Sequence, residues 1–309
     1  MIGRNLLLWA STNRWISERA VRAGFVRRSV SAFMPGETTA DALEAAAGLL
    51  AGGITPILTL LGENVTHASA AAATSSNYGA LIDEARRAGL NVEISIKPSQ
   101  LGFDLSPDLC ARNLLTISDR CQAAGLFLWL DMERSHYVDG TLALYRMLRE
   151  RTPRCGVALQ AYLFRTPADV EALVPLGAAI RLVKGAYLEP ASIAYQRKAD
   201  VDRQYFTLAS RLLSTDAARP GALLHIATHD VPLQERLHRV ISEQGVPKDR
   251  YAFAMLYGIR ADRQRELVRQ GEPVHCLVSY GPEWFPWYMR RLAERPANAW
   301  FVVKNLFRG

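Results

Sequence analysis

The amino-acid sequence predicts an α/β fold, a (β/α)8 barrel of the TIM type. Three observations support this prediction: short apolar runs rich in β-branched residues recur eight times, helical patterns separate them, and no Gly-x-Gly-x-x-Gly motif follows the first run. Near-continuous apolar strands that alternate with helices are typical of a parallel sheet covered on both faces. Eight such units in about 250 residues favour a closed barrel. The alternative, an open doubly wound sheet, is weakened by the missing glycine motif.

The eight predicted strands follow one another along the chain, and each is a short apolar run with β-branched or aromatic residues. Their ranges are 53–63, 91–102, 125–133, 155–163, 178–187, 221–230, 251–259 and 273–281. Apolar residues spaced at i, i+3 and i+4 predict helices. Such patterns occupy residues 40–53, 78–89, 140–152 and 233–245.

The chain is expected to divide into an N-terminal helical arm, residues 1–50, and a barrel catalytic domain, residues 51–309. The arm is predicted to form two or three helices that pack on the barrel. Near its end, Thr38 and Asp41 have the spacing of a capping box.

Composition indicates an ordinary globular protein with one large core, since 49% of its 309 residues are hydrophobic. The formal charge of +7 comes from cations scattered among 30 acidic residues, which argues against nucleic acid and favours anionic ligands or a membrane surface. The four cysteines lack Cys-x-x-Cys spacing, so neither a metal site nor a disulfide framework is predicted, and a cytoplasmic location is expected.

Polar side chains stand at the carboxyl ends of the predicted strands, where the chemistry of such barrels collects. A single buried Lys or Asp is more often half of a structural ion pair than a catalyst. Here several strands contribute, so their convergence favours a site for an anionic ligand. The residues at these ends are Glu63, Lys97, Asp131, Glu133, Gln160, Tyr162, Arg181, Lys184, Thr228, His229, Tyr257 and Tyr280.

The segment 284–298, "WFPWYMRRLAERPAN", places Arg290 and Arg291 beside several aromatic residues shortly after the last strand. An isolated arginine pair would be read as a solvated helix face. Paired guanidiniums beside an aromatic wall instead suit a small carboxylate ligand.

Taken together, the motifs "LLGENV", "IKPSQLG", "LDMERS", "RLVKGAY", "ATHD", "MLYGIR" and "YMRRLAERPAN" resemble the flavin-dependent proline dehydrogenases of the bacterial single-function form, over roughly residues 35–305. The resemblance implies a distorted (β/α)8 barrel whose last helix lies over the mouth. It also implies non-covalent FAD, bound without a dinucleotide fingerprint.

The resemblance assigns cofactor-binding roles to one set of residues. Arg181 would lie beside the redox-active ring, Gln160 would hydrogen-bond the flavin, and Lys184 would serve the phosphate end or the local fold. The others are Val183, Gly185 and Ala186, whose backbone would approach the cofactor, and Thr228 and His229, which would meet the ribose or pyrophosphate.

A second set would serve the substrate. Lys97, Arg290 and Arg291 would hold its carboxylate, Asp131 would orient a cation, and Tyr187 would wall the pocket. Glu63 would pair with Arg290 as a gate. The implied reaction is oxidation of L-proline to 1-pyrroline-5-carboxylate. A quinone would be the electron acceptor, reached by peripheral contact with the inner face of the membrane.

Three positions depart from the family pattern: Ala254 where the family often has glutamine, and Leu277 and Trp287 where it presents tyrosines. They leave alternatives open. One is a related flavoenzyme that oxidises another secondary amine, an N-substituted amino acid or a hydrazine-type substrate. Others are an aldolase-like barrel in which Lys97 or Lys184 forms a Schiff base, and a flavin-binding sensor.

Overall fold

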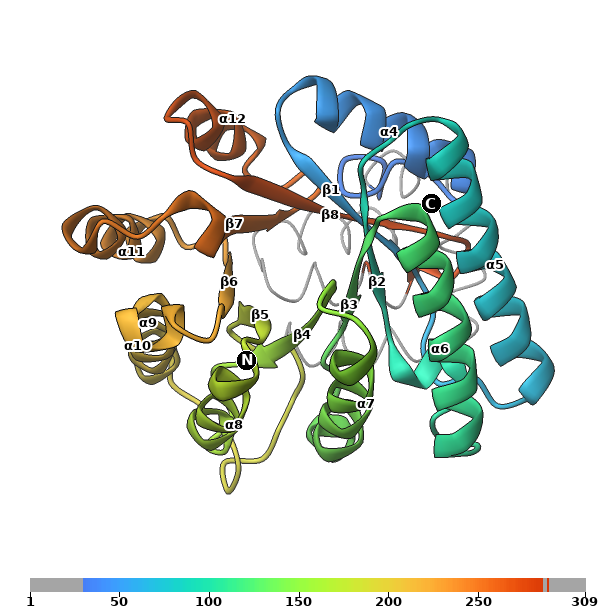
Figure 1. The fold of residues 1–309 in the computed structure, drawn as a ribbon, viewed down its shortest axis with the longest axis horizontal. Helices are drawn as coiled ribbons and strands as arrows, with labels where there is room; N and C mark the ends of the chain where they lie inside the picture. The colour runs from blue at the N-terminus through green and yellow to red at the C-terminus, as the bar shows by residue number, and fades with distance from the viewer. Residues whose placement is uncertain (1–29, 286–287, 289–309) are drawn as a thin grey trace, which may run out of the picture.

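A computed structural model describes residues 30–285 and residue 288 of the chain. Eight parallel strands form a closed barrel in the order β1 to β8, with β8 paired to β1, which confirms the predicted fold class (Figure 1). Each predicted strand range contains one observed strand. The strands are β1 (Thr55–Leu60), β2 (Glu93–Ile96), β3 (Phe127–Leu130), β4 (Cys155–Gln160), β5 (Ala179–Val183), β6 (Leu223–Ala227), β7 (Tyr251–Leu256) and β8 (Val274–Tyr280).

The helices lie outside the ring of strands (Figure 1). The α-helices are α4 (Thr39–Ala51), α5 (Ala68–Arg87), α6 (Pro107–Ala124), α7 (Val138–Arg151), α8 (Thr166–Leu173), α9 (Lys198–Leu213), α10 (Thr215–Ala218), α11 (Val231–Gln244) and α12 (Ala261–Arg269). Within residues 30–285, four 3-10 turns join them to the strands, namely η1 (Pro98–Leu101), η2 (Ser135–Tyr137), η3 (Val174–Leu176) and η4 (Lys248–Arg250).

Helix α4 begins with the predicted capping box. The hydroxyl of Thr38 accepts from the Asp41 amide at 3.1 Å, and the Asp41 carboxylate accepts from the Thr38 amide at 2.9 Å. The helix then packs against β1 and β8. The predicted arm up to residue 29 lies outside the described residues, so the boundary at residue 50 stays a prediction.

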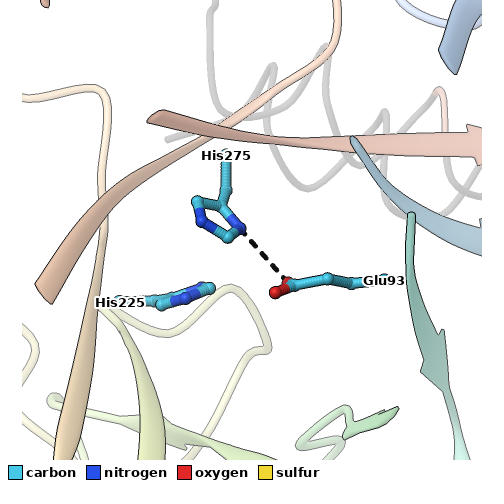
Figure 2. A group of neighbouring side chains, drawn as sticks. All are labelled: Glu93, His225 and His275. Atoms are coloured by element: carbon cyan, nitrogen blue, oxygen red, sulfur yellow. Dashed lines mark hydrogen bonds and ion pairs between the residues drawn. The ribbon is translucent and has the colours of Figure 1, made fainter. Parts of the chain in front are cut away.

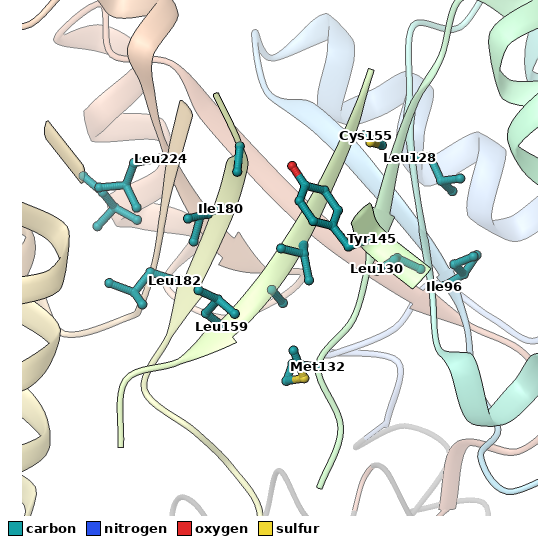
Figure 3. Packing of buried hydrophobic residues seen from close by; sticks show 14 of the residues in the cluster. Ile96, Leu128, Leu130, Met132, Tyr145, Cys155, Leu159, Ile180, Leu182 and Leu224 are labelled. Carbon is teal, nitrogen blue, oxygen red and sulfur yellow. The ribbon is translucent and has the colours of Figure 1, made fainter. Parts of the chain in front are cut away.

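The strands have two faces because successive side chains alternate. Outward-facing residues pack against the helices in one large core, of which Figure 3 shows Leu130, Leu159 and Leu182. Inward-facing residues form a smaller cluster around Ile57 and Trp129. Residues further along the inward face, toward the carboxyl ends, therefore point into the mouth of the barrel.

The predicted strand 91–102 is wrong in its second half. Strand β2 ends at Ile96, and residues 98–101 form the 3-10 turn η1. Pro98 lacks an N–H for strand pairing and suits the first position of a helical turn. Lys97 is thereby left at the N-cap of η1, where the strand has just ended.

Candidate active site

A cavity of about 430 Å³ lies at the carboxyl ends of the strands. The residues to which the sequence assigned cofactor or substrate roles, and which the structure describes, all line it, although they come from six separate segments of the chain: Glu63, Lys97, Asp131, Gln160, Arg181, Val183, Lys184, Gly185, Ala186, Tyr187, Thr228 and His229. The other strand-end residues named from the sequence, Glu133, Tyr162, Tyr257 and Tyr280, are not part of this lining. Two further predicted residues, Arg290 and Arg291, lie outside the described residues, as does Trp287. Their roles stay predictions.

Asp131 lies between two cations on one side of this cavity. Its Oδ1 accepts hydrogen bonds from the guanidinium of Arg181 and, at 2.9 Å, from the hydroxyl of Ser95. Its Oδ2 lies 3.7 Å from Nζ of Lys97. One carboxylate thus faces two cations, which leaves a net positive charge for an anionic ligand. Ser95, which the sequence analysis did not single out, also accepts from Arg181 at 2.8 Å.

Arg181 carries an orphan donor. Only 4% of the residue is exposed, and its Nη1 has no hydrogen-bond partner among the described residues. A buried donor without a partner is costly, so an acceptor on a bound group would satisfy it. The guanidinium also lies 5.1 Å from the ring centroid of Trp129, which fixes it from the other side. This arrangement fits a flavin bound against Arg181.

Gly185 allows the backbone after β5 to line the cavity. Its φ of +111° is a conformation that L side chains rarely adopt, and an added Cβ would meet the Tyr162 ring at 2.3 Å. The amide of Tyr162 donates to the carbonyl of Lys184 at 3.0 Å, which holds the two segments together. Bare backbone is therefore exposed to the cavity here, while contact between Gly185 and a cofactor stays a prediction.

Lys184 contacts two carboxylates, Asp202 of α9 and Asp230 at the N-cap of α11, the latter at 2.7 Å. Burial opposes ionisation of Asp230, but hydrogen bonds from Lys184 and Lys198 lower its pKa to about 2. Two roles were predicted for Lys184, one at the phosphate end of the cofactor and one in the local fold. These contacts support the second.

Glu133 is a contributor for which the sequence analysis assigned no role. It is buried, and its carboxylate accepts from the Ser99 amide at 3.0 Å and the Ser99 hydroxyl at 2.5 Å. It thereby fixes η1, the turn that Lys97 begins. Burial raises the pKa of Glu133 to about 7, although the bonds from Ser99 oppose the shift. The sequence could have indicated a role for Glu133 through its position two residues after Asp131.

The turn after β6 is fixed by hydrogen bonds. Nε2 of His229 accepts from the Leu256 amide at 2.9 Å, so that nitrogen carries no proton. The carbonyl of Thr228 accepts from Gln234 at 2.7 Å, and the hydroxyl of Thr228 accepts from the Asp230 amide at 3.2 Å. At the end of β4, the Gln160 side chain donates to the carbonyl of Glu133 at 2.8 Å. Hydrogen bonds thus hold the chain in place at the ends of both β4 and β6.

Comparison with known proteins gives concordant matches. The family model "Proline dehydrogenase" matches residues 42–304. "Proline dehydrogenase 1" of Bacillus subtilis is 32% identical over 306 residues, 99% of each chain. "Proline dehydrogenase" of Deinococcus radiodurans is 37% identical over 282 residues, 90% of this chain and 89% of that one.

Solved structures of two proline utilization A (PutA) proteins share the fold. The Bdellovibrio bacteriovorus protein has a TM-score of 0.80 at 22% identity and covers 87% of this chain. A mutant of the Bradyrhizobium japonicum protein has a TM-score of 0.72 at 24% identity and covers 90%. The match spans about a third of each PutA chain, 33% and 32%. Because the family model covers most of the chain and relatives exceed 30% identity over nearly its whole length, the chain belongs to the proline dehydrogenase family.

Proposed function

We propose that this chain is a proline dehydrogenase that binds FAD non-covalently and oxidises L-proline to 1-pyrroline-5-carboxylate. The observation that carries the proposal is the charge cluster in the cavity, in which Asp131 balances Lys97 and Arg181 while Arg181 keeps an unpartnered donor. The proposed reaction is the one that gives the proline dehydrogenase family its name.

The cofactor would be held by Arg181, Gln160, the backbone of residues 183–186, and Thr228 with His229. A bound flavin supplies a two-electron acceptor for the hydride that leaves the ring carbon next to nitrogen. With the flavin bound against it, Arg181 would bring a buried positive charge close to the group on which negative charge develops. Asp131 and Trp129 keep that guanidinium in position.

The substrate carboxylate would be bound by Lys97 with Arg290 and Arg291. Lys97 is placed by Asp131 on one side and by the turn η1, which Glu133 fixes, on the other. Tyr187 lines the same cavity as a wall of the substrate pocket. Glu63, also on the lining, would pair with Arg290 as a gate.

A quinone is proposed as the electron acceptor, met at the inner face of the membrane by a cytoplasmic protein. The formal charge of +7 supports contact with an anionic lipid surface. None of the helices within the described part of the chain is long and apolar enough to cross a membrane. Sedimentation with anionic vesicles, compared at low and high salt, tests the contact, which salt should weaken.

The absorption spectrum of the purified protein tests the cofactor. The protein should be yellow and should release FAD on acid precipitation. Anaerobic L-proline should then bleach the flavin band. A colourless protein that does not take up added FAD would overturn the proposal.

Substitution of Arg291 tests the carboxylate grip. Hydrogen bonds to charged groups contribute about 1.5–3 kcal/mol, so Arg291→Met should lower kcat/KM for proline about ten- to a hundredfold while FAD stays bound. The exposed Arg239 on α11 gives a matched control, and Arg239→Met should change neither quantity. Loss of flavin in parallel with activity would instead place Arg291 in the cofactor site or the fold.

A further inference from the structure

Three metal-ligating side chains meet inside the barrel, below the active-site cavity. They are Glu93 at the start of β2, His225 of β6 and His275 of β8 (Figure 2). None of them lines the cavity. His225 and His275 each precede a cavity-lining residue, Ala227 and Leu277, by two positions, so they share its inward face one level deeper.

The ligand atoms of this group are close enough for one ion. One atom from each residue lies within 4.8 Å of the others, and Nδ1 of His275 is 3.2 Å from Oε2 of Glu93. Ligands about 2.0–2.2 Å from Zn²⁺ in a tetrahedron lie roughly 3.4 Å apart. Side-chain movements of about 1 Å would therefore bring the ligand atoms to the separation that Zn²⁺ requires.

His225 supplies a second, independent observation. The residue is 1% exposed, and its Nδ1 has no hydrogen-bond partner in the described part of the chain. Burial, His275 and Arg181 lower the pKa of His225, so its imidazole is neutral, the form that binds metals. A buried imidazole nitrogen normally has a partner, and none of the described residues provides one here.

The surroundings resemble the outer shell of a metal site. The indole N–H of Trp129 donates to Oε2 of Glu93 at 2.8 Å and so orients the carboxylate. The Trp129 ring also packs 4.5 Å from the His225 ring, which limits the rotation of that imidazole. Outer partners of this kind hold metal ligands in their binding orientation. The positive charge of Arg181 lies nearby and would repel a bound cation, but Asp131 pairs with Arg181 and balances that charge.

We propose that Glu93, His225 and His275 bind a Zn²⁺ ion that joins β2, β6 and β8 across the barrel interior. Two imidazoles and one carboxylate suit Zn²⁺ and its transition-metal neighbours, whereas Mg²⁺ and Ca²⁺ prefer oxygen ligands throughout. The ion has a structural role and takes no part in proline oxidation. The cysteine spacing predicted no metal site, whereas these three ligands come from strands far apart in the chain.

Metal analysis of the gel-filtered protein, grown with zinc in the medium, tests the proposal directly. The wild type should contain about one equivalent of zinc per chain. His275→Gln and Glu93→Gln, which preserve size, should each lower the content at least tenfold. The control is His238→Gln, because His238 forms a similar pair with Glu272 at 3.0 Å outside the barrel. That variant should keep its zinc.

Refolding provides a readout that does not depend on the variants. Protein unfolded with a chelator and refolded with FAD should show a higher Tm when Zn²⁺ is present, by about 4 °C at a hundredfold excess over Kd. Absence of zinc from the wild type together with an unchanged Tm would overturn the proposal. Equal zinc content in wild type and His275→Gln would also overturn it, because the ion would then bind elsewhere.

Discussion

At the scale of single residues, the candidate site depends on carboxylates that hold cations in place. Asp131 contacts both Lys97 and Arg181, and Glu133 fixes the turn that follows Lys97. These two acids are two residues apart, yet their chemistry differs. Asp131 is paired with positive charge, whereas Glu133 accepts from neutral donors, and burial raises the pKa of Glu133 to about 7.

The raised pKa of Glu133 predicts a pH dependence of stability. The folded state holds the proton more tightly than the unfolded state, so this contribution is fully present below about pH 4.5 and is lost as pH rises through about 7. The free energy of unfolding should fall by up to about 3 kcal/mol across that window because of this group. Glu133→Gln keeps an acceptor for the Ser99 amide and should remove that fall.

Guanidinium unfolding of the two proteins at pH 5, 6, 7 and 8 measures this difference. Glu235→Gln, an exposed change on α11, serves as the control and should keep the wild-type slope. Identical slopes for wild type and Glu133→Gln would show that Glu133 does not titrate in this range.

The wall of the pocket predicts substrate preference. Leu277 and Ala254 line the cavity. The family resemblance implies hydrogen-bonding side chains at these two positions, so a hydroxyl on the substrate ring would be buried unpaired here. That costs about 1–3 kcal/mol. Trans-4-hydroxy-L-proline should therefore bleach the flavin with a kcat/KM about five- to a hundredfold below that of proline.

A substrate panel that adds pipecolate, N-methylated amino acids and a hydrazine analogue completes this test. An added apolar carbon would gain up to about 0.8 kcal/mol on burial, so such amines should be tolerated. Faster bleaching by hydroxyproline than by proline would show that the pocket argument is wrong. Bleaching only by another amine would assign a different substrate.

At the scale of elements, the site is built where strands end and the chain turns. Asp131 follows β3, Gln160 ends β4 and Val183 ends β5, and all three line the cavity at the mouth, as in other parallel barrels. Gly185 follows β5 in this way, and its backbone passes against the Tyr162 ring. Gly48 in α4 contrasts with it, because Gly48 is exposed with nothing near its Cβ position.

These two glycines predict opposite responses to the same substitution. Gly185→Ala should lower the free energy of unfolding by at least about 1–2 kcal/mol and weaken FAD binding, because the φ of +111° is unfavourable for alanine. Gly48→Ala should raise stability by about 0.5–1 kcal/mol, since alanine suits a helix interior better. Denaturant unfolding and flavin titration measure both. A Gly185→Ala variant as stable as wild type would refute the close approach.

The sequence predicted the strands and the cavity lining well, because buried runs and the polar residues after them are local signals. It missed what depends on tertiary contacts. The hydrogen bond that Ser99 donates to Glu133 joins residues 34 positions apart in the chain. The group of Glu93, His225 and His275 forms only when the barrel closes. The prediction also extended the strand through η1, whose four residues are all buried although Ser99 and Gln100 are polar.

At the scale of the whole molecule, one core encloses the barrel. The four cysteines lie at different places in it: Cys110 and Cys121 in α6, Cys155 in β4 and Cys276 in β8. All are free and buried. Burial raises the pKa of each thiol, to about 11 for Cys155 and about 12 for the others. The thiolate, the reactive form, is therefore suppressed throughout.

The shared core predicts that the thiols become reactive together. With an aromatic disulfide reagent at pH 8, the native protein should show no fast-reacting thiol, because reaction requires both exposure and ionisation. In guanidinium, four equivalents should react, with the same midpoint as the change in tryptophan fluorescence, since all four cysteines belong to one packed cluster. Quantifying the thiols after full denaturation provides the control. A cysteine that reacts quickly under native conditions, or at a lower guanidinium concentration than the rest, would show that its part of the barrel opens independently of the remaining core.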